Sequence, residues 1–263
     1  MATMPAYSPD DAARYDRTAE PLMVPLAVVL ADAAQVRTEA AVLDVVCGPG
    51  FAARVAAERA GPMGTVVGVD PDAAMVQVAA GHGAGYAIEW LQAEPDRLPL
   101  PSDSQDVVLS LHGMTALAQP RAAMAEALRV VRQTGSFAAT VWSPIEANPY
   151  LAAYQRALTE QGATEAVEVL RAATGCGAEQ LTGELRAAGW HEPARREVTL
   201  RIRLAGTIAA ATERLRGMPW GARLSTDAAL EAARSTLTQL TEFAEADGSL
   251  VVPFRAQLVH AYP

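Results

Sequence analysis

A short stretch from Leu43 to Phe51 places a carboxylate and a glycine turn where a predicted strand passes into a predicted helix. Asp44 lies four residues before Gly48, and Gly50 closes the turn. Glycines at such a turn let the backbone approach a ligand closely, and they leave the first amide groups of the helix directed at that ligand. The chemistry that this spacing suits is the binding of a polar or charged small molecule.

A second carboxylate follows at a spacing typical of nucleoside binding. Asp70 lies twenty residues after Gly50 and ends the apolar segment 66–69. A carboxylate at the end of that strand can accept two hydrogen bonds from a ribose diol. The two features together therefore predict a nucleoside-containing cofactor.

Two classes of cofactor fit the turn. Gly48, Gly50 and Ala53 also match the dinucleotide fingerprint, which would make the protein a nicotinamide-dependent oxidoreductase. Asp44 favours the other class, because a carboxylate there repels a pyrophosphate but suits a ligand with an ammonium and a sulfonium group. S-adenosylmethionine is such a ligand, and tight binding of NAD would restore the first class.

The elements that must position these residues follow an alternating pattern up to residue 142. Predicted strands cover 41–46, 65–69, 86–91, 106–111 and 136–142, and predicted helices cover 51–60, 72–80 and 121–132. Alternation of strand and helix implies right-handed crossovers, and therefore a parallel sheet with helices on both faces. The strands are nearly continuous apolar runs, as expected of strands buried on both faces.

The pattern changes after residue 142. Helices are predicted over 148–174, interrupted at Gly162, and over 177–189, followed by a strand over 197–204, a helical segment over 205–246 and a last strand over 249–262 broken by Pro253. No internal repeat and no linker divides the chain, so we expect one α/β domain with a helical insertion.

Further short stretches accompany the turn and its acid: Val67-Gly68-Val69-Asp70, Ile88-Glu89-Trp90, Leu98-Pro99-Leu100-Pro101, Asp106-Val107-Val108 and Ala188-Gly189-Trp190. With them the chain resembles a class I S-adenosylmethionine-dependent methyltransferase, of the branch with ubiquinone/menaquinone-type and natural-product small-molecule enzymes. The resemblance implies a Rossmann-like fold, a mostly parallel seven-stranded sheet with helices on both faces and a helical insertion before the last strand. It divides the chain into an N-terminal helical cover (1–40), a cofactor-binding core (41–142), acceptor-side helices with the sixth strand (143–204), the insertion (205–246) and the last strand (247–263).

The resemblance also implies the residues that bind S-adenosylmethionine: Tyr15, Asp44, Cys47, Gly48, Gly50, Asp70, Pro71, Met75, Ala93, Glu94 and Leu111. In the family, Asp44 and the turn 48–50 would hold the methionine end, and Asp70 the ribose hydroxyls. Glu94 stands where relatives usually have Asp, and Pro95 lacks the N–H that many relatives direct at adenine.

His112, directly after the strand 106–111, is the candidate catalytic residue. An unperturbed imidazole, with a pKa of about 6.5, suits a general base that takes a proton from the acceptor, and the rate would then fall below about pH 6. The alternative is a histidine that only lines the pocket. No metal site is predicted, because the other histidines lack the paired spacing of metal ligands.

We also interpret two tryptophans and three arginines from the sequence. Trp142 and Trp220 are candidates for the wall of an acceptor pocket, although either is as readily a core residue. Arg214, Arg216 and Arg223 are interpreted as a solvated helix face. The insertion 205–246 is either a lid or the surface of a homodimer.

The predicted activity is methyl transfer from S-adenosylmethionine to a small organic acceptor in secondary metabolism, with S-adenosylhomocysteine as product. Glu94 and Pro95 motivate an alternative, a protein of this fold that binds the cofactor or its product but catalyses a non-methylating reaction such as a cyclisation, or serves as a binding module.

Composition excludes some partners. The 263 residues include 30 acidic residues and 21 basic ones, all Arg, for a net charge of −9, so a basic stripe for nucleic acid is missing. The longest apolar stretch, 22–31, is about half of the ~20 residues that a membrane span requires. Two cysteines cannot form a disulfide framework. These counts lead us to expect a soluble cytoplasmic protein.

Overall fold

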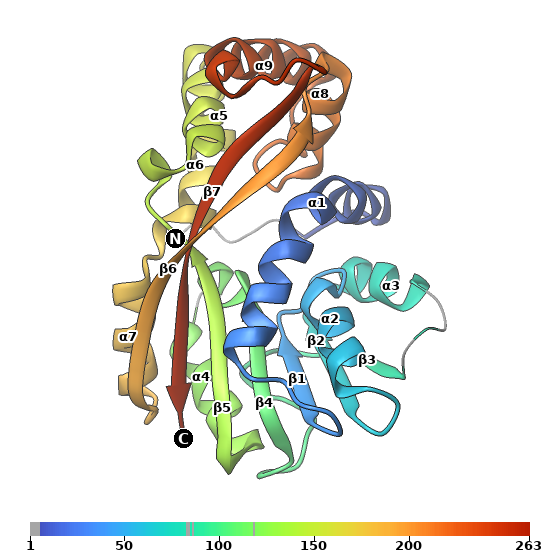
Figure 1. The fold of residues 1–263 in the computed structure, drawn as a ribbon, viewed down its shortest axis with the longest axis vertical. Coiled ribbons are helices and arrows are strands. Elements are labelled where there is room, and N and C mark those ends of the chain that lie inside the picture. Colours follow the sequence, from blue (N-terminus) through green and yellow to red (C-terminus); the bar gives the residue numbers. More distant parts are fainter. Residues whose placement is uncertain (1–5, 83–84, 86, 118) are drawn as a thin grey trace.

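The computed structural model describes residues 6–82, 85, 87–117 and 119–263, and its centre is a seven-stranded sheet (Figure 1). The strands are β1 (Ala41–Val45), β2 (Thr65–Asp70), β3 (Ile88–Gln92), β4 (Gln105–Leu111), β5 (Val131–Trp142), β6 (His191–Ala205) and β7 (Ser249–Tyr262). Their order is β3-β2-β1-β4-β5-β7-β6. The first five strands pair in parallel, and β7 is antiparallel to both of its neighbours. The predicted fold class is confirmed.

The described helices flank this sheet and cap one of its ends. They are α1 (Pro9–Ala33), α2 (Phe51–Ala60), α3 (Ala73–Gly81), α4 (Pro120–Val130), α5 (Pro149–Glu160), α6 (Thr164–Gly175), α7 (Ala178–Ala187), α8 (Ile208–Gly217) and α9 (Thr226–Gln239). No described helix has the length and apolar character needed to cross a membrane.

The central strands are buried on both faces because successive side chains alternate between two cores. In β1, Val42 packs with α1 and α2 on one face, whereas Leu43 and Val45 pack with α4 and α7 on the other. From β1 the chain proceeds outward to β2 and β3, and from β4 it proceeds the other way to β5. The strand order therefore reverses between β1 and β4, and the crevice outside their carboxyl ends is the place where open α/β sheets bind ligands.

The hairpin of β6 and β7 extends beyond the rest of the sheet. β5 pairs with β7 from Phe137↔Ala261 to Trp142↔Ala256, whereas β6 continues to pair with β7 as far as Ala205↔Ser249. The projecting half lies among α5, α8 and α9, which form a cap above the sheet in Figure 1. The predicted helical insertion, α8 and α9, lies between these two strands.

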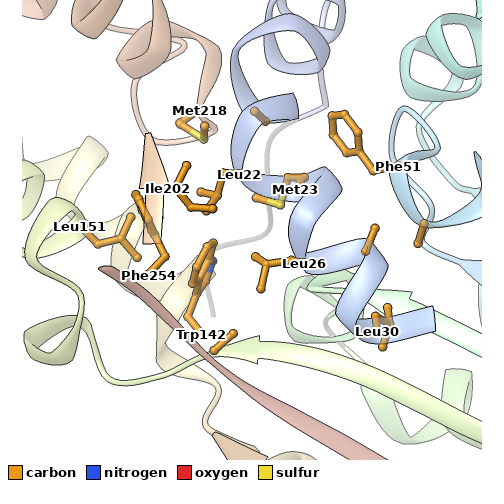
Figure 2. Close-up of a cluster of buried hydrophobic side chains, with 14 of the residues drawn as sticks. Leu22, Met23, Leu26, Leu30, Phe51, Trp142, Leu151, Ile202, Met218 and Phe254 are labelled. Atoms are coloured by element: carbon orange, nitrogen blue, oxygen red, sulfur yellow. The ribbon is translucent and has the colours of Figure 1, made fainter. Parts of the chain in front are cut away.

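Helix α1 connects the sheet to the cap. Its Leu22, Met23 and Leu26 lie between Phe51 of α2 and the side chains of Trp142 and Phe254 (Figure 2). On the cap side, a Cβ added at Gly217 of α8 would lie 2.0 Å from Thr18 Oγ1, so the two helices are in close contact.

Several predicted boundaries are wrong. β6 begins at His191 rather than at 197, and β5 begins at Val131, where helix was predicted up to 132.

Pro253 does not break β7, which runs without interruption. The N–H of Arg255 points away from β6 and donates to Asn148 Oδ1 at 2.7 Å. Pro253 lies two residues earlier, so its nitrogen faces the same edge of β7. At that position β5 no longer pairs with β7. A proline is tolerated at such an edge because it interrupts no ladder hydrogen bond. Of the predicted strand 86–91, Tyr86 lies outside the described residues.

Candidate functional site

A cavity of about 490 Å³ lies at the carboxyl ends of β1, β2 and β4 and continues between α1 and the cap. The predicted residues that line it are Tyr15, Cys47, Gly48, Asp70, Pro71, Met75, Glu94, Leu111 and His112. Three predicted residues, Asp44, Gly50 and Ala93, do not line it. The cap contributes residues of α5 and α8 and the segment 218–220 that follows α8.

The two glycines of the turn have different surroundings. Both have left-handed backbone, with φ of +56° at Gly48 and +86° at Gly50. A Cβ added at Gly48 would meet no atom within 4 Å, whereas one at Gly50 would lie 2.3 Å from the Trp90 ring. Gly48 therefore leaves room for a ligand against the backbone, and Gly50 leaves room for Trp90.

Asp44 lies beneath this turn. Its side chain is fully buried, and Oδ2 accepts a hydrogen bond from the Ala53 N–H of α2 at 2.9 Å. Within the described part of the chain, Oδ1 has no hydrogen-bond donor. Burial raises the pKa of Asp44 to about 8, although the bond from Ala53 acts in the opposite direction. A cation held at the turn would stabilise the ionised form of this carboxyl group.

Asp70, at the end of β2, faces the cavity and organises two backbone segments. One oxygen accepts a hydrogen bond from the Gly48 N–H at 2.7 Å, and the other accepts one from the Asp72 N–H at 2.9 Å. Burial raises the pKa of Asp70 to about 6, opposed by these two hydrogen bonds. The group is therefore predominantly ionised at pH 7 and remains an acceptor for hydroxyl groups.

The N-terminal segment lies over this end of the cavity. The Tyr7 N–H donates to Asp72 Oδ2 at 2.8 Å, and the Tyr7 and Tyr15 rings lie 5.8 Å apart. Both rings pack against the small cluster that contains Met75. The segment is thus attached to the loop that follows Asp70.

The third strand supplies little to the wall. Glu94 is exposed at the rim of the cavity, and Ala93 packs into the core on the α4 side. Cys47 is buried, with its Sγ 3.5 Å from the Gly48 carbonyl oxygen, and burial raises the pKa of its thiol. A protonated, packed thiol is a poor nucleophile, so the structure gives Cys47 no catalytic role.

His112 lies between the cofactor end and the cap. Its backbone is left-handed (φ +60°), and its ring stacks on Trp142 with the centroids 4.2 Å apart and an interplanar angle of 12°. Burial lowers the pKa of His112 to about 3. The imidazole is therefore neutral throughout the physiological range. The fall in rate that the sequence led us to expect below pH 6 is replaced by the expectation of a rate without inflection there.

Aromatic side chains and an arginine line the cap end of the cavity. Trp142 and Trp220 both line it, as do Tyr150 and Phe254. The interpretation of Arg214 as solvated is wrong: it is 9% exposed and lines the cavity, whereas Arg223 is exposed as expected. No local sequence pattern distinguishes the two arginines, because the Tyr150 hydroxyl that contacts Arg214 lies 64 residues away along the chain.

The part of the chain that contains the glycine turn 48–50 is similar to known methyltransferase sequences. Residues 43–139 match the family model described as a methyltransferase domain. A ubiquinone/menaquinone biosynthesis C-methyltransferase of Hahella chejuensis is 36% identical over 108 residues, which are 40% of this chain and 43% of that protein. The chain covers less than half of the length of the first curated relatives that it matches.

Solved structures share the fold over most of the chain. A putative methyltransferase from an antibiotic biosynthesis pathway of Anabaena variabilis gives a TM-score of 0.62 at 14% identity, covering 89% of this chain and 96% of that one. The [4+2]-cyclase SpnF gives a TM-score of 0.56 at 21% identity, covering 91% and 80%. At these identities the likeness is one of fold.

Proposed function

We propose, from the premise that residues 43–139 form a class I S-adenosylmethionine-dependent methyltransferase domain, that this protein transfers a methyl group to a small organic acceptor. The observation that carries the proposal is the joint placement of Gly48 and Asp70 on one cavity wall, linked by a 2.7 Å hydrogen bond. This wall offers open backbone and a carboxylate side by side, as a nucleoside cofactor requires.

The residues present fit S-adenosylmethionine. Asp70 would accept hydrogen bonds from the ribose hydroxyls, and Gly48 leaves space for close approach of the methionine end. Asp44 is not on the wall, but its buried Oδ1 has no donor among the described residues and its pKa is raised, so it favours a cationic ligand above it. Met75 and Tyr15 supply apolar and aromatic surface beside Asp70.

When bound, S-adenosylmethionine supplies an electrophilic methyl group together with its leaving group. The contribution of the chain is then chiefly to position the acceptor and to exclude water. Residues of helix α1 and of the segment 218–220 line the cavity, which supports this role.

We assign His112 to orientation of the acceptor. A neutral imidazole with a strongly lowered pKa is a poor proton acceptor, but its nitrogen can accept a hydrogen bond from an acceptor hydroxyl or amine. Its stack on Trp142 gives the ring a defined orientation for this contact.

The alternative is a non-methylating reaction on the same cofactor site, as in a cyclase. One structural neighbour is a [4+2]-cyclase, and in the present chain Pro95 has no N–H for adenine. The family match over residues 43–139 favours methyl transfer as the first candidate.

The proposal also includes the metabolic class of the acceptor, the cellular location and the oligomeric state. An acceptor in secondary metabolism is supported by the structural neighbour from an antibiotic biosynthesis pathway. Cys47 and Cys176 are free thiols, as in cytoplasmic proteins. A homodimer stays a prediction, with the insertion 205–246 either a lid over the cavity or the dimer surface.

The test combines calorimetry with a transfer assay. S-adenosylhomocysteine is titrated into the protein, and S-adenosylmethionine labelled in its methyl group is then incubated with the protein and a panel of aromatic hydroxy and amino acids. Binding accompanied by labelled product supports methyl transfer. Binding without labelled product from any acceptor favours the alternative, and absence of binding contradicts both.

A further inference from the structure

The cavity contains a buried cation on its α8 side. Arg214 donates from Nη1 to the Tyr150 hydroxyl at 2.5 Å and from Nη2 to the Ala205 carbonyl oxygen at 3.1 Å. Both acceptors are uncharged groups. In the part of the chain that the structure describes, none of the ion pairs involves Arg214.

Tyr154, beside Arg214, does not supply a negative charge. The Tyr150 and Tyr154 hydroxyls lie 3.1 Å apart, and burial raises the pKa of Tyr154 well above its usual range. This phenol therefore keeps its proton at neutral pH. A guanidinium that is 9% exposed and has no carboxylate partner among the described residues favours the entry of an anion, because a buried charge is stabilised most by an opposite charge.

Trp220 gives a second, independent observation. Its side chain is 6% exposed and lines the same cavity. Its indole Nε1–H has no acceptor among the residues that the structure describes. A buried donor without an acceptor is unfavourable, and an oxygen atom of a bound ligand would satisfy it. Arg214 and Trp220 are thus both hydrogen-bond donors suited to a ligand that carries oxygen.

The wall between His112 and Arg214 is formed by flat apolar groups. The His112 ring contacts Trp142, the Trp142 ring lies 6.3 Å from Phe254, and Phe254 lies 5.7 Å from Tyr150. Aromatic walls of this kind favour planar apolar ligands, and a few polar groups then set the orientation of the ligand.

We propose that the cap end of the cavity binds an aromatic carboxylate, with the carboxylate on Arg214 and the ring system along Trp142 and Phe254. The planar fork of a guanidinium matches the two oxygens of a carboxylate. The carboxylate end then lies on Arg214, and the other end of the acceptor extends toward His112. This inference rests on the proposed function for the identity of the ligand as methyl acceptor.

Two probes of the same shape test the anion site: 2-naphthoate and its uncharged counterpart 2-naphthamide. Each is titrated into the protein saturated with S-adenosylhomocysteine, and binding is followed by the fluorescence of the tryptophans in the wall and by calorimetry. We expect the parent protein to bind 2-naphthoate at least tenfold more tightly than 2-naphthamide.

Variants test whether Arg214 causes the preference for 2-naphthoate over 2-naphthamide. Arg214→Gln should remove the preference for the charged probe, and Arg214→Lys should keep part of it. Arg223→Gln is the matched control, because Arg223 belongs to the same inserted segment but is exposed and pairs with Glu165 at 2.7 Å. That control should leave both affinities unchanged.

Equal affinity of the two probes for the parent protein would overturn the proposal, even if Arg214→Gln failed to fold. A full preference retained by a folded Arg214→Gln protein would overturn it as well. Binding of S-adenosylhomocysteine without the preference would leave the proposed function standing and remove the anion site. If S-adenosylhomocysteine does not bind, the probes are titrated into the protein alone, and a preference there would keep the anion site and remove the proposed function.

Discussion

The Asp70 carboxylate accepts a hydrogen bond from the Gly48 N–H at 2.7 Å, across 22 residues of sequence. The bond joins the end of β2 to the turn after β1, and both residues line the cavity. A single side chain therefore maintains the shape of the turn and presents its remaining lone pairs to a ligand.

Replacement of Asp70 by alanine should weaken S-adenosylhomocysteine binding by about 1.5–3 kcal/mol, or roughly 10- to 150-fold, because a charged hydrogen-bond partner is lost. Calorimetry measures the change. Asp96→Ala is the control, since Asp96 is an exposed acid near the same end of the sheet and does not line the cavity. Equal affinities of parent and Asp70→Ala would show that the ribose site lies elsewhere.

Gly48→Val should abolish cofactor binding because its side chain fills the space that the ligand needs. Gly61→Val provides a matched comparison: Gly61 also has left-handed backbone (φ +69°) and open space beside its Cα, but it is outside the cavity. Both variants should lose about 1–2 kcal/mol in unfolding experiments from backbone strain. If Gly61→Val lost binding to the same extent, strain rather than occlusion would be the cause.

Cofactor affinity should depend on pH through Asp44. Burial raises its pKa to about 8, so in the ligand-free protein the group is mostly protonated at pH 7. A cation bound at the turn favours the carboxylate, so binding should release a proton and affinity should rise between about pH 6 and 8. Calorimetry in buffers of different ionisation enthalpy counts the released protons.

The same shift has a consequence for stability. Because the folded pKa of Asp44 exceeds the unfolded value, its contribution is greatest at low pH and is lost as pH rises toward 8 in the ligand-free protein. Asp44→Asn should flatten both pH dependences while keeping an oxygen for the Ala53 N–H. An unchanged pH dependence in this variant would contradict the role of Asp44.

His112→Ala should lower kcat by about 10²-fold, as expected for a misplaced acceptor, with little change in cofactor affinity. His112→Phe keeps a ring for the stack on Trp142 but removes the nitrogens, and it should be as slow. Because the pKa is lowered to about 3, kcat at saturating cofactor should show no inflection near pH 6. A fast His112→Phe enzyme would reduce His112 to a packing residue.

The sequence was sufficient to predict the cofactor end because its determinants are local. A buried strand, a glycine turn and a helix follow one another from Leu43 to Ala60, and Asp70 ends the next strand. Parallel strands bring their carboxyl ends to one edge of a sheet, so the proximity of Gly48 and Asp70 follows from the order of the elements.

The cap end could not be predicted in the same way. Arg214 belongs to a helix whose pattern resembles a solvated one, but α8 packs against α1 and α9, and the Arg214 guanidinium is buried at the Tyr150 hydroxyl of α5. The first half of β6, which includes Arg195 and Arg196, was missed because it is an exposed edge strand without apolar alternation. The pKa of His112 depends on burial by neighbours that are distant in sequence, such as Trp142.

The most direct test of the central claim is a crystal structure of the protein with S-adenosylhomocysteine. We expect the ribose hydroxyls within hydrogen-bonding distance of the Asp70 carboxylate, the amino group of the ligand at the turn above Asp44, and its sulfur facing the wall formed by His112 and Trp142. A ligand ordered at another site, or one whose ribose lies away from Asp70, would contradict it.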